Sequence, residues 1–378
     1  MSSRGPSSAS SWALCLLLVG LGSPSARAAP DEPLERGEPV DEGELSAYDR
    51  GRVTFDVAND DFGSDLDQGF TSGIEVSFRF TPGPSVGLRK LDPGIERRTV
   101  SEHWGLLLGH QIHTPAKLQE IDLENLVDDR RYAGWLYGTL FAELGVAGSP
   151  FMDGGYAEYR AGLTVGATGP QIETEALHRY WHAFIRDVAN RRQLPEDPRG
   201  WGVYQVPNHI GVNLELAQEA EIYRFSLEDA GLRKLFGSQL GFRVASLVGA
   251  RVGNMFVDAE LGATLRAGLM PEVVFDRRML PVDPEVSFDL PLAIFGFVTG
   301  RVIGSAYDAL LDGPPGAEGH YPERNHVLTR LEAGFGVRIS LVELMFRHTT
   351  LSPDLKNRPP GGTWIQNYGR ITLSFAFY

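Results

Sequence analysis

From residue 53 onwards, apolar and polar residues alternate in runs of about ten residues, most of them separated by Gly, Pro, Asp or Asn. Alternation with a period of two is the pattern of a strand with two unlike faces. Ten runs are clear. Together with residues 53–59 and at least one strand within residues 290–307, they predict about twelve strands. The clearest runs are residues 72–80, 104–112, 132–144, 156–165, 210–217, 239–248, 256–269, 327–339, 341–348 and 369–378.

The C-terminal run favours a barrel over a soluble sandwich. It places Ile371, Leu373, Phe375 and Phe377 on one face and small or polar residues on the other, with Tyr378 one residue beyond. Such a closing strand is typical of bacterial outer-membrane barrels. We therefore predict an all-β, antiparallel transmembrane barrel of about 12 strands. We also expect interfacial aromatic girdles, formed by Trp104, Trp135, Tyr137, Phe141, Tyr156, Tyr159, Trp364 and Tyr368.

Two stretches depart from the alternating pattern. Residues 173–188 carry helical periodicity, so we expect one short helix inserted between strands. Residues 290–311 resemble a membrane helix, but Arg301 and Asp308 would then lie inside the bilayer at considerable cost. We predict two strands and a turn there instead.

The N-terminus indicates an exported chain. Arg4 precedes the apolar run 12–21, and small residues lead to a cleavage position after Ala28, so residues 1–28 are predicted to be a signal peptide. The single cysteine, Cys15, lies inside that segment, and the mature chain would have no disulfide. Residues 29–50 are expected to form an acidic, disordered lead-in. Residues 51–378 would then form the barrel, located in the bacterial outer membrane.

The charge of the chain excludes one class of partner. The formal net charge is −14, and removing the predicted signal peptide takes away two arginines and no acid. Because binding nucleic acid requires positive charge to neutralise phosphates, we expect no nucleic-acid partner.

The first candidate for chemistry lies within residues 55–80. Four Asp and one Asn occur within residues 59–67, between two strand-like runs. Oxygen donors gathered where strands end are suited to a hard cation such as calcium. The same residue types are common in solvated turns, and this stretch alone favours that interpretation.

Two further motifs are weaker. Residues 83–87 fit the Gly-x-Ser-x-Gly elbow around Ser85, but no helical pattern follows, so we interpret them as a turn. His178 and His182 are four residues apart and share a helical face, a spacing that can ligate zinc. Arg179 occupies the place of the glutamate that a metalloprotease helix requires. The pair is then either exposed to solvent or a source of a general base.

Several stretches together resemble the outer-membrane lipid A 3-O-deacylases over about residues 53–213. They are residues 59–60, 67–73, 111–115, 129–135, the helix with His182, residues 200–201 and Gln205. The resemblance implies a twelve-stranded barrel with its active site near the outer leaflet. It also implies calcium-dependent hydrolysis of the ester at the 3-position of lipid A, with lipopolysaccharide in the bilayer as the partner, and we expect a monomer.

The resemblance also implies roles for individual residues. Asn59, Asp60 and Thr71 match positions around the metal and the scissile ester, with Asp60 as a calcium ligand. His182 matches the catalytic histidine, and Lys117 matches a basic residue near the phosphate or sugar of the substrate.

Two residues depart from the family pattern. His178, which we place at the substrate, stands where the family has Gln, and Arg131 stands where it has Pro.

We hypothesise that His182 takes a proton from the attacking water, that calcium on Asp60 polarises the carbonyl, and that Asn59 stabilises the oxyanion. Thr71 would orient the loop or the metal. Two alternatives remain: an outer-membrane phospholipase-like esterase with a serine nucleophile, and a non-catalytic barrel or porin.

Overall fold

The protein is described here by a computed structural model. It describes residues 51–60, 69–82, 87–88, 99–126, 128–152, 155–189, 198–227, 231–232, 238–270, 292–357 and 365–377. The predicted signal peptide and lead-in lie outside these ranges, as do Ser85, Trp364 and the acidic residues between 61 and 67.

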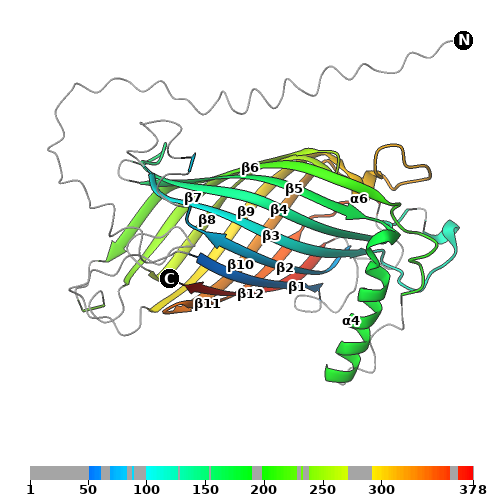
Figure 1. Ribbon diagram of the computed structural model, residues 1–378, viewed down its shortest axis with the longest axis horizontal. Helices are drawn as coiled ribbons and strands as arrows, with labels where there is room; N and C mark the ends of the chain where they lie inside the picture. The colour runs from blue at the N-terminus through cyan, green and yellow to red at the C-terminus, as the bar shows by residue number, and fades with distance from the viewer. Residues whose placement is uncertain are drawn as a thin grey trace, which may run out of the picture. The chain divides into compact units, whose positions relative to one another are not determined.

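Twelve antiparallel strands close into one barrel, with each strand paired to its neighbours in sequence and β1 paired to β12 (Figure 1). The strands are β1 Gly51–Asn59, β2 Gly69–Phe80, β3 Thr99–Thr114, β4 Ala133–Ala147, β5 Tyr156–Thr168, β6 His209–Leu227, β7 Gln239–Gly253, β8 Phe256–Met270, β9 Leu292–Asp308, β10 Val327–Ile339, β11 Val342–Leu351 and β12 Gln366–Phe377. The predicted fold class is confirmed.

Residues 290–311 were predicted wrongly. They form a single strand, β9, followed by the short helix α6, Ala309–Asp312, rather than two strands and a turn. Arg301 points to the lumen, where it forms ion pairs with Glu260 at 2.7 Å and Glu332 at 3.6 Å. A charged residue in the inward phase of a strand carries no bilayer cost, so no turn is needed to accommodate it.

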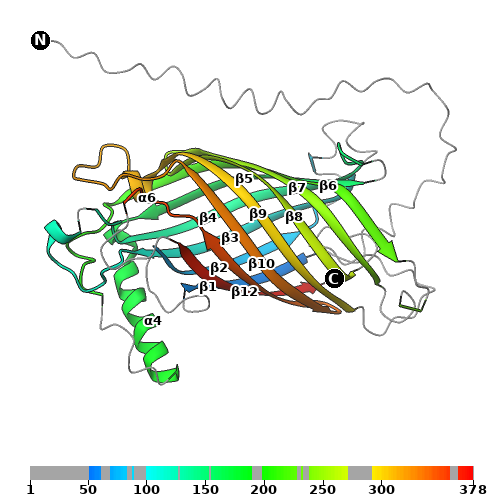
Figure 2. The same cartoon turned by 180° about the vertical axis from the view of Figure 1, so that it is seen from behind.

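The expected inserted helix is α4, Thr174–Ala189, between β5 and β6. Two single-turn 3₁₀ helices are also present, η3 Leu123–Asn125 and η4 Pro170–Ile172. In the described parts of the chain, no helix has the length and apolar character needed to cross a membrane. Figures 1 and 2 place α4 at the barrel end opposite the C-terminus, and we call this end the α4 rim.

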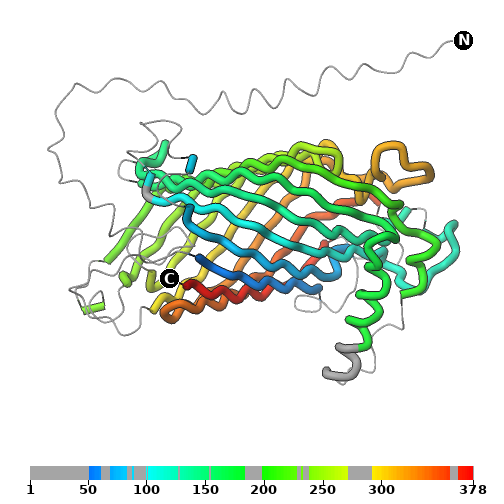
Figure 3. Tube along the Cα trace, in the orientation of Figure 1, coloured from blue at the N-terminus to red at the C-terminus, as the bar shows by residue number. Residues whose placement is uncertain are grey.

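Along the barrel wall, which Figure 3 traces strand by strand, inward and outward positions differ sharply in chemistry. Ion pairs line the lumen: Glu143, 1% exposed at its side chain, pairs with Arg79 at 3.3 Å and Arg160 at 3.6 Å. The outward positions are mostly exposed apolar side chains, as the phase of β12 predicted for Ile371 and Phe375. This is the two-faced wall of a membrane barrel with a polar interior.

The expected aromatic girdles are only partly present. Trp135, Phe141, Tyr156 and Tyr368 are buried in the protein, whereas Tyr159 is exposed. Trp135 packs in a core with Val206 and Met255 at the α4 rim, so proximity to a strand end did not imply contact with lipid for these residues.

Candidate functional site

The outward face of β3 changes character along its length. Leu106 and Leu108 are 47% and 58% exposed, as lipid-facing residues are. Ile112 and Thr114 have the same outward parity, yet they are 2% and 0% exposed. Alternate residues of a strand share a face, so Ile112 and Thr114 should face lipid as Leu106 and Leu108 do. Something on the outside of the barrel therefore covers the last residues of this strand.

The N-terminal turn of α4 provides part of that cover. The hydroxyl of Thr174 lies 3.0 Å from Nε2 of His110, another outward residue of β3. Gly134 on β4 allows this approach, because a Cβ there would collide with the Thr174 side chain. Glycine therefore lets the helix begin directly against the barrel wall.

The predicted oxygen groups lie at the same rim, on the ends of β1 and β2. Asn59 is the last residue of β1 and pairs with Ser72 of β2, and Asp60 follows it; both side chains are buried. A register shift at Thr71 interrupts the β2–β3 ladder, and the Thr71 hydroxyl lies 2.6 Å from that of Thr114. Bulges commonly re-aim a side chain next to a functional site, and this one turns Thr71 towards β3.

The two histidines lie on one buried stripe of α4. Thr174, His178 and His182 recur every four residues, so they share a helical face, and each is buried. The rings of His178 and His182 meet edge to face with centroids 4.4 Å apart. The predicted alternative of two histidines exposed to solvent is wrong.

Trp201 fixes the chemical state of His178. Its indole Nε1–H donates to Nδ1 of His178 at 3.1 Å, and both residues are fully buried. Since an accepting Nδ1 carries no proton, His178 is neutral with its hydrogen on Nε2. This bond joins positions 23 residues apart, and no local pattern predicted it.

A buried stack leads from this pair to the loop that carries Lys117. The ring of Tyr132 packs on Trp201 with centroids 4.9 Å apart, and its hydroxyl donates to the carbonyl of Leu118 at 2.6 Å. Lys117 precedes Leu118 and is half-buried. The structure therefore joins the helix of His182 and the loop of Lys117 in one packed layer.

The same loop is braced by Asp129. Its carboxylate accepts the backbone N–H groups of Ala116 and Arg130, each at 2.8 Å. Burial, the dominant influence, raises the pKa of Asp129 to about 6, against the lowering effect of these hydrogen bonds. Arg131 is the second departure from the family pattern. Its guanidinium carbon lies 5.0 Å from the ring centroid of Tyr204 and 4.3 Å from that of Tyr321, so it connects three rim loops.

The donor set at the β1–β2 rim suits a hard cation. Asp60 offers a carboxylate, Asn59 an amide oxygen and Thr71 a hydroxyl, and oxygen donors of this mixture are those that calcium prefers. Within the described ranges, no three His, Cys, Asp or Glu side chains gather as a metal cluster. The oxygen donors at this rim have the chemistry that calcium prefers, whereas zinc sites are built from the nitrogen and sulfur atoms of His and Cys.

Sequence reasoning gave no site role to His110, Thr114 or Thr174, and no supporting role to Tyr132 or Trp201, although the resembling stretches include Thr114, Tyr132 and Trp201. The alternation along the strand could have identified two of them. His110 and Thr114 fall on the same face as Leu106 and Leu108, and polar residues on a lipid-facing side need an explanation.

Comparison with known proteins agrees with the barrel fold. Residues 13–377 match the model of the family described as "Outer membrane protein LpxR". The solved structure of LpxR from Salmonella typhimurium aligns with a TM-score of 0.61 and 15% identity, over 86% of this chain and all of that one. Lower likenesses include the β domain of the Bordetella autotransporter BrkA, with TM-score 0.37, 9% identity and coverage of 86% and 98%. No curated protein sequence matches significantly.

The match extends over nearly the whole chain, and the barrel has the strand number and closure expected of an outer-membrane protein. The chain therefore belongs to the outer membrane protein LpxR family.

Proposed function

We propose that this protein is a calcium-dependent lipid A 3-O-deacylase, a carboxylic ester hydrolase that acts within the outer membrane. Membership of the LpxR family supports an outer-membrane protein that modifies lipid A. The observation that carries the proposal is that histidine, amide, carboxylate and hydroxyl side chains are all buried at the α4 rim, where α4 meets the outward side chain of His110 and Thr71 meets Thr114.

His182 is the general base. It takes a proton from the water that attacks the ester carbonyl, so no acyl-enzyme forms. His178 holds the ring of His182 by its edge-to-face contact, while Trp201 keeps His178 neutral through the bond to Nδ1. A neutral neighbour adds no repulsion when His182 gains its proton, which favours the transfer.

The other polar residues stabilise the oxyanion and orient the substrate. Asn59 donates an amide N–H to the oxyanion of the tetrahedral intermediate, and the Thr71–Thr114 hydroxyl pair holds the adjacent backbone in place. Lys117, on the braced β3–β4 loop, binds the phosphate or sugar of lipid A.

Asp60 would hold calcium, with Asn59 and neighbouring backbone carbonyls as further oxygen donors. When bound, this ion supplies positive charge that polarises the ester carbonyl.

The proposal is tested by mass spectrometry of lipid A from outer membranes that contain His182→Ala. The wild type should remove the 3-O acyl group, and the variant should lose about 10²–10⁴-fold in rate. Tyr180→Ala, at a position 68% exposed on the same helix, is the matched control and should stay active. Unchanged deacylation by His182→Ala would refute the assignment.

The metal is tested separately on purified protein. Chelation should abolish activity, and calcium should restore it. Restoration by zinc alone would move the metal to His178 and His182.

A porin is disfavoured by the charge pairing in the lumen. Glu143 is shared between two arginines, and Glu332 lies 3.6 Å from both Arg301 and Arg347. Ion conductance in planar bilayers without lipid A hydrolysis would reverse this preference.

A further inference from the structure

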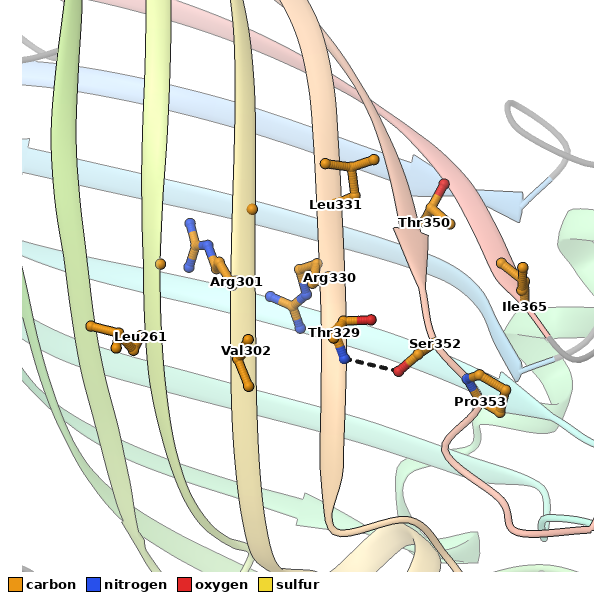
Figure 4. Close-up of a pocket in the computed structure, with 12 residues that line it drawn as sticks. Leu261, Arg301, Val302, Thr329, Arg330, Leu331, Thr350, Ser352, Pro353 and Ile365 are labelled. Atoms are coloured by element: carbon orange, nitrogen blue, oxygen red, sulfur yellow. Dashed lines mark hydrogen bonds between the residues drawn. The ribbon is translucent and has the colours of Figure 1, made fainter.

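A second feature occupies the outward wall, away from the catalytic residues. A groove of about 680 Å³ lies across β8 to β11, with Leu261, Val302, Leu331 and Ile365 among its lining residues (Figure 4). These four side chains are between 48% and 63% exposed, so the groove opens to the lipid side of the wall.

The groove exists because β9 carries a glycine where its neighbours carry side chains. Gly300 pairs with Leu331 of β10, and a Cβ built on it would meet no atom within 4 Å. Backbone packing therefore does not require glycine there, and the missing side chain leaves the space open.

The lining offers hydrocarbon contacts and few polar ones. Ser352 uses its hydroxyl to accept the Thr329 N–H at 2.9 Å, and Thr350 donates to Asn367 at 2.8 Å. Arg301 turns into the lumen, where it pairs with Glu260. Arg330, between the outward residues Thr329 and Leu331 of β10, also borders the groove. The exposed side chains of the lining are mostly apolar, and a groove of this kind facing lipid suits a saturated hydrocarbon chain.

The near end of the groove lies two strands from the candidate site. Its margin includes Ile365, and the adjacent Gln366 accepts the backbone N–H of Phe70 at 3.3 Å, next to Thr71. β11 is separated from β1 only by β12 in the barrel. At about 4.8 Å between strands, the groove therefore begins roughly 10 Å across the wall from Asn59.

We propose that this groove binds one saturated acyl chain of the lipid A molecule whose 3-position ester is cleaved, which rests on the proposed function. Lipid A carries several chains on one head group. A chain held beside β9 and β10 would orient the head group so that its 3-position ester faces His182.

The test uses two variants on one strand face. Gly300→Phe fills the groove with an apolar side chain. Gly296→Phe is the matched control, because Gly296 faces outward from the same strand, lies outside the groove and has 3.7 Å of clearance at its Cβ. Gly300→Phe should raise KM for hexa-acylated lipid A about tenfold, as expected from losing contacts of about two methylene groups. Gly296→Phe should leave KM unchanged.

Cross-linking measures occupancy without catalysis. His182→Ala protein is placed in phosphatidylethanolamine–phosphatidylglycerol vesicles with lipid A that carries a diazirine at the end of a secondary acyl chain. Cross-links should concentrate on residues 300–302 and 329–331, and Gly300→Phe should reduce them about tenfold, consistent with the KM change. A phospholipid with the same diazirine should label the wall evenly.

The outcomes separate the two claims. Even labelling by both lipids, or equal behaviour of Gly300→Phe and Gly296→Phe, would overturn the groove assignment. An inactive wild type that still shows focused labelling by lipid A would refute the proposed reaction and retain the groove.

Discussion

Two parts of the outward wall have opposite chemistry. Along β8 and β9, the exposed outward residues are Leu, Ile, Ala, Val and Gly, and nothing in the described chain covers them. At the α4 rim of β1 to β3, outward positions hold Asn59, His110 and Thr114, beneath the helix or the rim loops. In these two regions, the polar groups on the lipid side lie where protein shields them, which marks a site rather than a surface.

Removing the polar character of the covered region should have the largest effect. Asn59→Leu keeps the approximate size of the side chain and makes it apolar, like the outward residues of β8 and β9. Losing an oxyanion donor should lower kcat by about 10²–10³-fold. The assay is lipid A deacylation in detergent micelles, and Val57→Leu, two residues earlier on the same face, should be neutral. An active Asn59→Leu variant would remove this residue from the mechanism.

Adding charge to the bare region should have the next largest effect. Leu265 is 44% exposed in the middle of β8, and Leu265→Arg should destabilise the barrel by about 2–4 kcal/mol. Urea unfolding in phospholipid vesicles measures this loss, with Leu265→Ile as the control. An unchanged unfolding midpoint would mean that this face does not contact hydrocarbon.

Weakening the support of His182 should have a smaller effect. Trp201→Phe removes the N–H that fixes His178, so kcat should fall about tenfold and the pH–rate profile should shift, while KM stays constant. Trp104→Phe is the matched control, since it also removes an indole hydrogen bond, to Glu102 at 2.9 Å, on the lower part of β3. If both variants show the wild-type pH profile, Trp201 has no positioning role.

The smallest expected effect is on stability, through the loop that the Asp129 carboxylate braces. The folded-state pKa of about 6 lies above the ordinary 3.8, so the folded protein binds the proton more tightly than the unfolded chain. Its contribution to stability is complete below about pH 4 and is lost as the pH rises to about 6. Thermal unfolding should show this decline, and Asp129→Asn should reduce it. An identical pH dependence in the variant would contradict the assignment.

The sequence predicted the barrel well because alternation is a local property of each strand. It also brought Asn59 and Asp60 together, since they are adjacent in the chain. It did not predict the stack from His182 to Tyr132, because those contacts join a helix, a loop and a strand end that only the closed barrel brings together. The error in residues 290–311 had a similar origin: Arg301 looked misplaced until its partners on the neighbouring strands β8 and β10 were known.

The central claim is that the covered region of the outward wall hydrolyses one ester of lipid A. The most direct test is the mass of lipid A from a host with ordinary hexa-acylated lipid A, measured with and without expression of the wild-type protein. We expect a lipid A product that lacks only the acyloxyacyl group of the 3-position. An unchanged mass in membranes that contain the folded protein, or loss of a chain from another position, would contradict it.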